Sequence, residues 1–581
     1  MVETVRALPE GFVANPSATL AVPKRVREVI LRHLEALSER GRDLAIVAAV
    51  IGREFDFPLL CRSAGLEEND AAESLEELVR CRVLHSVGER FDFTHDRIRE
   101  VAYGRLLRER QRALHARIAN SMETLYADRL AEQVERLAHH AARGELGDKA
   151  VGYLRQAGAK AFANSAHTDA LAYFTQALDL LGKLAPGPAR DREELSLRLA
   201  LGPALQATRG YATPEVEQNY ARARQLADEV GAPVQRFQAL WGIWLVASHR
   251  ASAGTALELG RELLALAERF DDPALLLEGH HALWPVLVWL GSADAARRHL
   301  DQGMALYDKA RHRSHAFVYG GHDPGVCCRK VASWASWILG YPKRGLEESV
   351  ASLKLARELD HPTSIIVALV WACVFRDLRR ELHEVGEHAR ALITLATEHE
   401  ASQWLAAGTI IDGFVHAELG QGELAIAQIR RGLAAYGSTG AHLFVPYFLS
   451  LLARACLKIG EPREGLRVIG EALERARTTG ERVWEAELIR LEGELRLAAS
   501  PDDVAEALDC FRRAIEIARS QAARSWELRA ALSLARLLVA EGQRDEAKRT
   551  LAVYEWFTEG LDTADLREAK ALLEDLARGQ A

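Results

Sequence analysis

Apolar residues recur three and four positions apart along most of the chain, which is the pattern of amphipathic helices. Pro23 opens one such segment, a second covers residues 44–50, and Asp56 begins a third. The lead before them, residues 1–22, carries the end of a helix that prolines and a glycine interrupt. The N-terminal part of the chain is therefore predicted to contain short helices.

Residues 83–94 depart from this pattern. Two short runs of β-forming residues flank Gly88 and Glu89, which predicts a β-hairpin with a glycine turn. Over residues 23–120 the predicted order is helix, helix, helix, hairpin, helix, which is typical of a winged-helix module. We therefore expect a small winged-helix-like domain at 23–125.

From about residue 130 a short unit recurs: a turn, an acidic or small residue, then Ala or Gly, then an apolar residue. Successive copies lie 46, 40, 39, 50, 40, 40, 40, 42 and 40 residues apart. A period near 40 predicts antiparallel helix pairs of the tetratricopeptide type, in which the small residue lets two helices approach closely. The copies fall at positions 170, 216, 256, 295, 345, 385, 425, 465, 507 and 547, of which Val216 and Val385 are weaker copies.

The predicted fold is all-α. A tetratricopeptide-like α-solenoid of about ten helix pairs covers residues 130–560, and a capping helix at 561–581 closes its last apolar face. The winged-helix-like domain with its one β-hairpin precedes the solenoid. The two longest steps imply insertions, and the larger one falls at 311–330, a stretch rich in Gly, His and Cys.

Charge and cysteine content narrow the class of protein. Lys and Arg number 74 against 82 Asp and Glu, for a net charge of −8, which makes a nucleic-acid partner unlikely on balance. The seven cysteines include no Cys-x-x-Cys pair, which fits reduced thiols in the cytoplasm. The longest apolar run, Ile365–Phe375, is well short of the roughly 20 residues of a membrane span.

Several motifs in the chain fit one family. The runs 50–56 (VIGREFD) and 93–103 (FTHDRIREVAY) resemble the winged-helix segment of bacterial STAND-type signalling ATPases. Later runs resemble the tetratricopeptide region of these ATPases, which belongs with MalT-like repeats. In that family an output domain, often an adenylate or guanylate cyclase, precedes an ATPase and then the repeats. The later runs are 209–216 (RGYATPEV), 322–327 (HDPGVC), 480–488 (GERVWEAEL) and 554–560 (YEWFTEG).

The chain has no Gly-x4-Gly-Lys-Ser/Thr phosphate loop and no cyclase-sized N-terminal domain. We therefore expect no enzyme activity, no catalytic residue and no cofactor, and we interpret residues 1–22 as a remnant of an ATPase core. The leading hypothesis is a sensor module that binds a protein or small ligand on the concave repeat surface and acts on an ATPase in trans. The alternatives are a C-terminal fragment of a cyclase-linked ATP-binding protein and a winged-helix DNA-binding regulator.

His95 is the candidate nucleotide sensor in the winged-helix part. The resemblance implies that this histidine touches a bound nucleotide's phosphate, and an imidazole at a helix N-terminus suits that task. The alternative is a structural histidine that bridges hairpin and helix. DNA binding is disfavoured because the expected recognition segment carries six acidic residues, which would repel phosphate: Glu67, Glu68, Asp70, Glu73, Glu76 and Glu77.

Tryptophans concentrate in residues 241–404 and several stand 11 or 12 positions before the small residue of their unit. This places them on the first helix of successive units, the helix that lines the concave side of tetratricopeptide arrays. They form either an inter-repeat core or an aromatic groove for a peptide or small ligand. The predicted groove residues are Trp244, Trp284, Trp334, Trp337, Trp371 and Trp404.

The insertion at 311–330 contains potential metal ligands. Its histidines and cysteines suit zinc chemically, but their spacing matches no closed zinc site and adjacent cysteines rarely bind one ion. We therefore predict no metal, and expect a loop that caps the repeat groove. The residues concerned are His312, His315, His322, Cys327 and Cys328.

Overall fold

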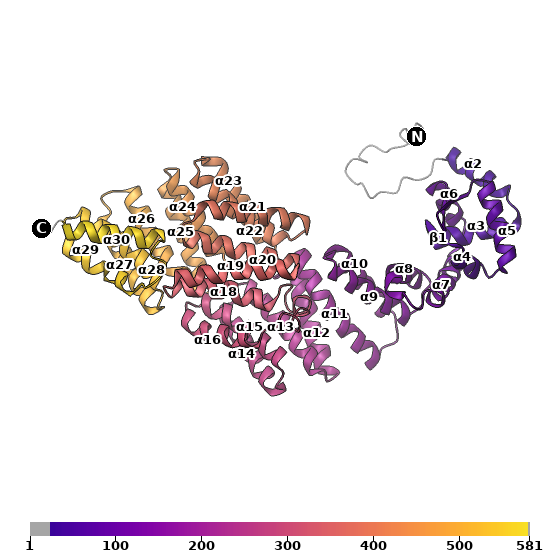
Figure 1. The fold of residues 1–581 in the computed structure, drawn as a ribbon, viewed down its shortest axis with the longest axis horizontal. Coiled ribbons are helices and arrows are strands. Elements are labelled where there is room, and N and C mark those ends of the chain that lie inside the picture. The colour runs from indigo at the N-terminus through magenta and orange to yellow at the C-terminus, as the bar shows by residue number, and fades with distance from the viewer. Residues whose placement is uncertain (1–23, 579–581) are drawn as a thin grey trace. The chain divides into compact units, whose positions relative to one another are not determined.

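The structure is a computed structural model that describes residues 24–578, so the predicted lead at 1–22 lies outside the described residues. The chain divides into two compact units, both mainly helical (Figure 1). Of the described residues, 24–160 and 172–185 form the first unit, and 161–171 and 186–578 form the second. Within residues 24–578, no helix combines the length and the apolar composition that a membrane span requires.

The first unit contains the predicted hairpin and one strand that the sequence pattern did not reveal. Strands β2 and β3 pair antiparallel around Gly88, and β1 pairs with the other edge of β3, giving the order β1-β3-β2. The elements are α2 (Lys24–Glu35), α3 (Glu39–Ile51), β1 (Glu54–Asp56), α4 (Phe57–Ala64), α5 (Glu68–Arg80), β2 (Leu84–Val87), β3 (Arg90–Phe93), α6 (Asp96–Gly104) and α7 (Arg108–Leu125).

Polar contacts at helix ends fix these elements. The Asp56 carboxylate accepts a hydrogen bond from the Leu59 amide at the start of α4, as expected of an N-cap, and another from the Tyr126 hydroxyl at 2.6 Å. The Ser38 hydroxyl caps α3 and also donates to Glu77 of α5. The caps thus tie together helices that lie far apart in the sequence.

The first compact unit ends later in the chain than the boundary at 125–130 that the sequence pattern predicts. Most of the region that follows α7 packs with the first unit. Within this region, the small Gly158 meets the Phe174 ring. The first unit therefore extends to residue 160 and resumes at 172–185. The elements of this region are η2 (Leu130–Gln133), α8 (Val134–Arg143), α9 (Asp148–Ala163) and α10 (His167–Leu181).

The second unit is an all-α solenoid of antiparallel helix pairs, as predicted (Figure 1). Each pair has a first and a second helix, and α30 covers the last pair. The helices are α11 (Pro188–Arg209), α12 (Pro214–Glu229), α13 (Pro233–His249), α14 (Ala253–Phe270), α15 (Pro273–Trp289), α16 (Ala293–Leu306), α17 (His315–Val318, in the insertion), α18 (Pro324–Ile338), α19 (Pro342–Leu359), α20 (Pro362–Leu378), α21 (Leu382–Glu398), α22 (Ser402–Glu418), α23 (Gly422–Ser438), α24 (Val445–Lys458), α25 (Pro462–Thr479), η3 (Arg482–Trp484), α26 (Glu485–Ala499), α27 (Val504–Ser520), α28 (Arg524–Ala540), α29 (Arg544–Thr550), η4 (Leu551–Trp556) and α30 (Ala564–Arg578).

The small residue of each repeat is the third or fourth residue of a second helix, where that helix meets the first helix of its pair. A Cβ added to Gly345 would lie 2.8 Å from the Ser333 carbonyl oxygen of α18, and one added to Gly465 would lie 3.3 Å from the Ala453 carbonyl oxygen of α24. Close helix approach therefore explains the repeated Ala or Gly.

The turn inside each pair is equally regular. Seven first helices end two residues before a residue with positive φ, which reverses the chain into the second helix. Five of the seven are glycines, as the cost of this conformation for other residues would suggest. They are Ala251, Gly291, Gly340, Arg380, Gly420, Gly460 and Gly542.

The first helices also contact one another, both in consecutive units and in units five apart. Helix α11 touches α22, the end of α13 touches the start of α24, and α18 touches α28. The His249 carbonyl oxygen, for example, accepts hydrogen bonds from the His442 and Leu443 amides at 2.8 and 3.1 Å. The solenoid is thus a superhelix that closes on itself once in about five units.

Gly340 and Gly420 provide a matched pair to test this closure. Their φ angles are +91° and +89°, but an added Cβ at Gly340 would meet the Trp556 ring and lie 2.9 Å from Cβ of Arg524, whereas none lies within 4 Å at Gly420. We expect Gly420→Ala to cost about 1 kcal/mol for backbone strain and Gly340→Ala about 2–4 kcal/mol, because overpacking adds to the strain. Equal shifts of the two denaturant midpoints would show that the packing of Gly340 against Trp556 and Arg524 adds no stability.

Candidate functional site

Nine of the eleven tryptophans lie on first helices of the solenoid, and ten of the eleven are buried. Rings from distant units meet: Trp334 stacks on Trp484, four units further along, with centroids 5.0 Å apart, and Trp337 meets Trp526, five units further along, edge-on at 4.7 Å. The ten are Trp241, Trp244, Trp284, Trp289, Trp334, Trp337, Trp371, Trp404, Trp484 (in η3, just before α26) and Trp526.

The six predicted groove residues are therefore placed in the interior. None is more than 8% exposed, and they contact other rings instead of solvent. The physical reason is the closure of the superhelix, which brings the inner faces of first helices against each other. Those residues are Trp244, Trp284, Trp334, Trp337, Trp371 and Trp404.

A charged pocket of about 260 Å³ opens between the first helices of the C-terminal units and α30. Six cationic side chains and five carboxylates line it, so the wall carries one excess positive charge when all are ionised. The cations are Arg380, Arg454, Lys458, Arg490, Arg529 and Arg536, and the carboxylates are Glu418, Glu487, Glu494, Asp565 and Glu568. Every one lies on, or at the end of, a helix in the series α20, α22, α24, α26, α28 and α30.

Shared carboxylates organise the pocket wall. Asp565 of α30 accepts from Arg380 at 3.1 Å and from Arg529 at 2.6 Å, so it joins units four apart. Glu568 accepts from Arg380 and Arg536, each at 2.8 Å. Burial acts to raise the pKa of Asp565, but Arg529 and Arg380 outweigh it and hold that pKa below its usual range.

The base of the pocket is fixed and its rim is open to solvent. The Arg490 side chain is 9% exposed and is held by Glu487 at 2.7 Å, while that of Arg529 is 12% exposed. At the rim the side chains of Arg536 and Lys458 are 53% and 51% exposed, and the nearest carboxylate to Lys458 Nζ is Glu418 at 4.0 Å. The exposed rim cations, above buried and ion-paired arginines, can donate hydrogen bonds to carboxylate groups of a partner.

His95 lies, as expected, where the hairpin enters a helix. It is the exposed N-cap residue of α6, and its side chain makes no hydrogen bond to the helix N-terminus. Its contact with a nucleotide stays a prediction.

Helix α5 presents an acidic face to solvent, with Glu68, Glu73 and Glu76 exposed. The arginines of the neighbouring helices pair with carboxylates, as in Arg110 with Asp43 at 2.8 Å and Arg112 with Glu145 at 3.2 Å. This charge arrangement agrees with a solvated protein face better than with a DNA-binding one.

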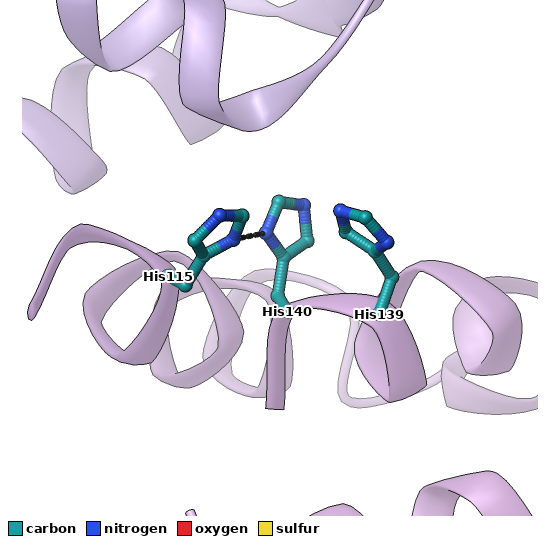
Figure 2. A group of neighbouring side chains, drawn as sticks. All are labelled: His115, His139 and His140. Carbon is teal, nitrogen blue, oxygen red and sulfur yellow. Dashed lines mark hydrogen bonds between the residues drawn. The ribbon is translucent and has the colours of Figure 1, made fainter. Parts of the chain in front are cut away.

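Three histidines that sequence analysis did not single out gather in the first unit. Figure 2 shows His115 of α7 beside His140 and His139 of α8. The Nδ1 atoms of His115 and His140 share a hydrogen bond of 2.9 Å, and Nε2 of His115 lies 3.1 Å from the Tyr103 hydroxyl. Burial lowers the pKa of His115 to about 4 and that of His140 well below its usual range, so this pair is neutral near pH 7.

The insertion residues separate into different environments. Nδ1 of His315 bonds Glu278 of α15 at 2.7 Å, His312 Nδ1 accepts from the Asp308 amide, and the Cys328 thiol donates to the Leu300 carbonyl. His322 and Cys327 do come together, and they meet His281 of α15. No sequence pattern pointed to His281, because it lies some 40 residues upstream in another helix.

Comparisons with known proteins give limited similarity. No protein-family model matches the sequence. An uncharacterized protein of Rhizobium meliloti (strain 1021) is 27% identical over 540 residues, which cover 91% of this chain and 51% of that protein. The chain thus spans about half the length of the curated relative that it matches.

Similar solved structures are helical-repeat proteins at low identity. A Rap protein complexed with competence and sporulation factor is 12% identical with a TM-score of 0.45, covering 64% of this chain and 98% of that one. A STAND protein with a tetratricopeptide repeat sensor from Pyrococcus horikoshii is 13% identical with a TM-score of 0.25, covering 97% and 68%. The assignment of the fold therefore rests on the helix packing of this chain and not on these similarities.

The buried histidine pair predicts acid sensitivity of the first unit. The pKa of His115 in the folded protein lies below its usual value near 6.5. The unfolded chain therefore binds the proton at a higher pH than the folded protein does, and the free energy of unfolding decreases as the pH falls from about 6.5 toward 4. Hydrogen exchange over residues 108–143 should show lower protection at pH 5 than at pH 7 after correction for intrinsic rates. His115→Gln should reduce this difference, and His85→Gln, on exposed β2, should not. An unchanged difference in His115→Gln would assign the effect elsewhere.

Proposed function

We propose that the chain is a non-catalytic regulatory module whose solenoid binds a protein segment bearing carboxylates. The observation that supports this most is the charged pocket, because six helices of one structural series converge on it with exposed cations at its rim. A fixed network beneath the rim costs little conformational entropy when a partner binds, since its side chains are already held.

The first unit supports a finer proposal, in which it is a winged-helix-type module that passes occupancy of the solenoid to a STAND-type ATPase. Its supporting features are the order helix, strand, two helices and hairpin, and an exposed histidine, His95, at the N-terminus of α6. In this proposal the ATPase acts in trans or within a longer gene product, and DNA binding is not the task of the acidic α5.

A second candidate is that the chain works as the C-terminal region of a longer cyclase-linked nucleotide-signalling protein. The length of the Rhizobium relative favours it, because about half of that protein lies outside the matched region. A phosphate-loop domain joined to this chain or encoded beside it would favour the second candidate over a module that acts alone.

Photocrosslinking in the native cell tests the pocket directly. Benzoylphenylalanine at position 536, on the rim, should give a specific protein adduct, whereas position 513 of α27, whose arginine is 54% exposed, should not. Lys458→Glu reverses a rim charge without touching the buried ion pairs, and we expect it to weaken the adduct at 536 roughly tenfold. Arg513→Glu is the matched control for that reversal.

The proposal fails if positions 536 and 513 capture the same proteins, or if the adduct at 536 is as strong in Lys458→Glu as in the unmodified chain. Raising the salt concentration should weaken the adduct in parallel with the charge reversal, because exposed ion pairs are screened.

A further inference from the structure

A second cluster of nitrogen and sulfur ligands lies inside the solenoid. One ligand atom each from His281, His322 and Cys327 lies within 4.8 Å of the other two, and the three residues are 1%, 8% and 3% exposed. His281 belongs to α15, Cys327 to the first turn of α18, and His322 to the insertion before α18. Three separate pieces of chain thus bring their ligand atoms to one buried point.

The two imidazoles are oriented by hydrogen bonds on their far side. Nδ1 of His281 bonds Glu278 Oε2 at 2.8 Å, and Nδ1 of His322 bonds the Gly320 carbonyl oxygen at 3.1 Å. A carbonyl can only accept, so Nδ1 of His322 carries the proton. The lone pair is then on Nε2, which is buried and has no protein hydrogen-bond partner. An acceptor behind each ring is the arrangement that orients histidine ligands in metal sites.

We propose that His281, His322 and Cys327 bind one divalent metal ion of the zinc class, through Nε2 of each ring and the cysteine sulfur. Imidazole and thiolate are the ligands that zinc prefers, and three protein ligands leave a fourth position open. Zinc–ligand bonds of about 2.0–2.3 Å place ligand atoms about 3.4–3.6 Å apart in a tetrahedron. The three atoms, which lie within 4.8 Å of one another, would move closer by roughly 1 Å when a metal binds. The thiol proton leaves to solvent when the sulfur binds.

Charge balance in the cluster favours a cation. Glu278 is fully buried and is shared by His281 and His315, whose Nδ1 lies 2.7 Å from its other oxygen. A divalent ion would neutralise this carboxylate and the thiolate together. Lys330 of α18 also faces the sulfur and lies over the Trp371 ring at 5.0 Å, so it is a competing positive charge close to the site.

The histidine cluster of Figure 2 offers a contrast. There the Nδ1 atoms of His115 and His140 bond each other, and Nε2 of His115 faces the Tyr103 hydroxyl. Those ring nitrogens already have partners outside any proposed metal site, whereas Nε2 of His322 faces the Cys327 sulfur, which is itself a proposed ligand. The solenoid cluster is therefore the better candidate for a metal, which would fasten the insertion to α15 and α18.

Cobalt substitution in the full chain tests the proposal. The protein is produced with Co²⁺ in place of zinc, under reducing conditions, because the site is buried. We expect one equivalent of Co²⁺ with tetrahedral absorption and a thiolate-to-cobalt charge-transfer band. Cys327→Ser should abolish that band, and Glu278→Gln, which disturbs the support behind His281, should weaken affinity 10- to 100-fold.

Two matched controls locate the ion. Cys328→Ser changes the adjacent buried cysteine, whose thiol faces the Leu300 carbonyl, and should keep the charge-transfer band. His139→Gln removes the exposed member of the Figure 2 cluster and should also keep it. If Cys327→Ser fails to fold, His322→Gln should still show weakened binding. The absence of a charge-transfer band in the unmodified chain, or its survival in Cys327→Ser, would overturn the proposal.

Discussion

The second unit depends on one packing constraint: the inner faces of first helices must meet the helices that lie five units further along the chain. Backbone hydrogen bonds from residues 442 and 443 to His249, and ring contacts such as Trp337 with Trp526, satisfy it. The pairs themselves contribute only local order, since each leaves an apolar face that its neighbours must cover. The contacts between units five apart then join the successive helix pairs into a closed superhelix with an aromatic interior.

The same inner surface changes character along the chain. Tryptophans fill much of it, and arginines and carboxylates at the helices α20 to α30 of the first-helix series line the charged pocket, with Arg529 lying over the Trp337 and Trp526 rings where the two regions meet. Ion pairs removed from water are costly unless each charge has close partners. The shared carboxylates Asp565 and Glu568 supply them. Recognition is therefore proposed at the charged end, where solvent reaches the rim, and not at the rings.

Helix pairs and their period could be predicted from the sequence because their cause is local. The repeated Ala or Gly marks a helix crossing within one pair, and the glycine between two β-forming runs marks a hairpin. Closure of the superhelix could not be predicted, because it depends on contacts between residues some 200 positions apart, such as Arg380 and Asp565. The burial of the tryptophans follows from that packing. The meeting of His281 with Cys327 joins the neighbouring first helices α15 and α18, and the late boundary of the first unit likewise depends on tertiary packing, so neither could be predicted from local patterns.

Quenching of tryptophan emission by iodide tests the closed interior most directly. Iodide reaches only exposed rings, and of the eleven tryptophans Trp556 alone is not buried. If the superhelix is closed, iodide should quench little more of the native emission than the part that comes from Trp556. After unfolding, iodide should quench nearly all of the emission. Quenching of half or more of the native emission would show that solvent reaches the first helices, and would contradict the account.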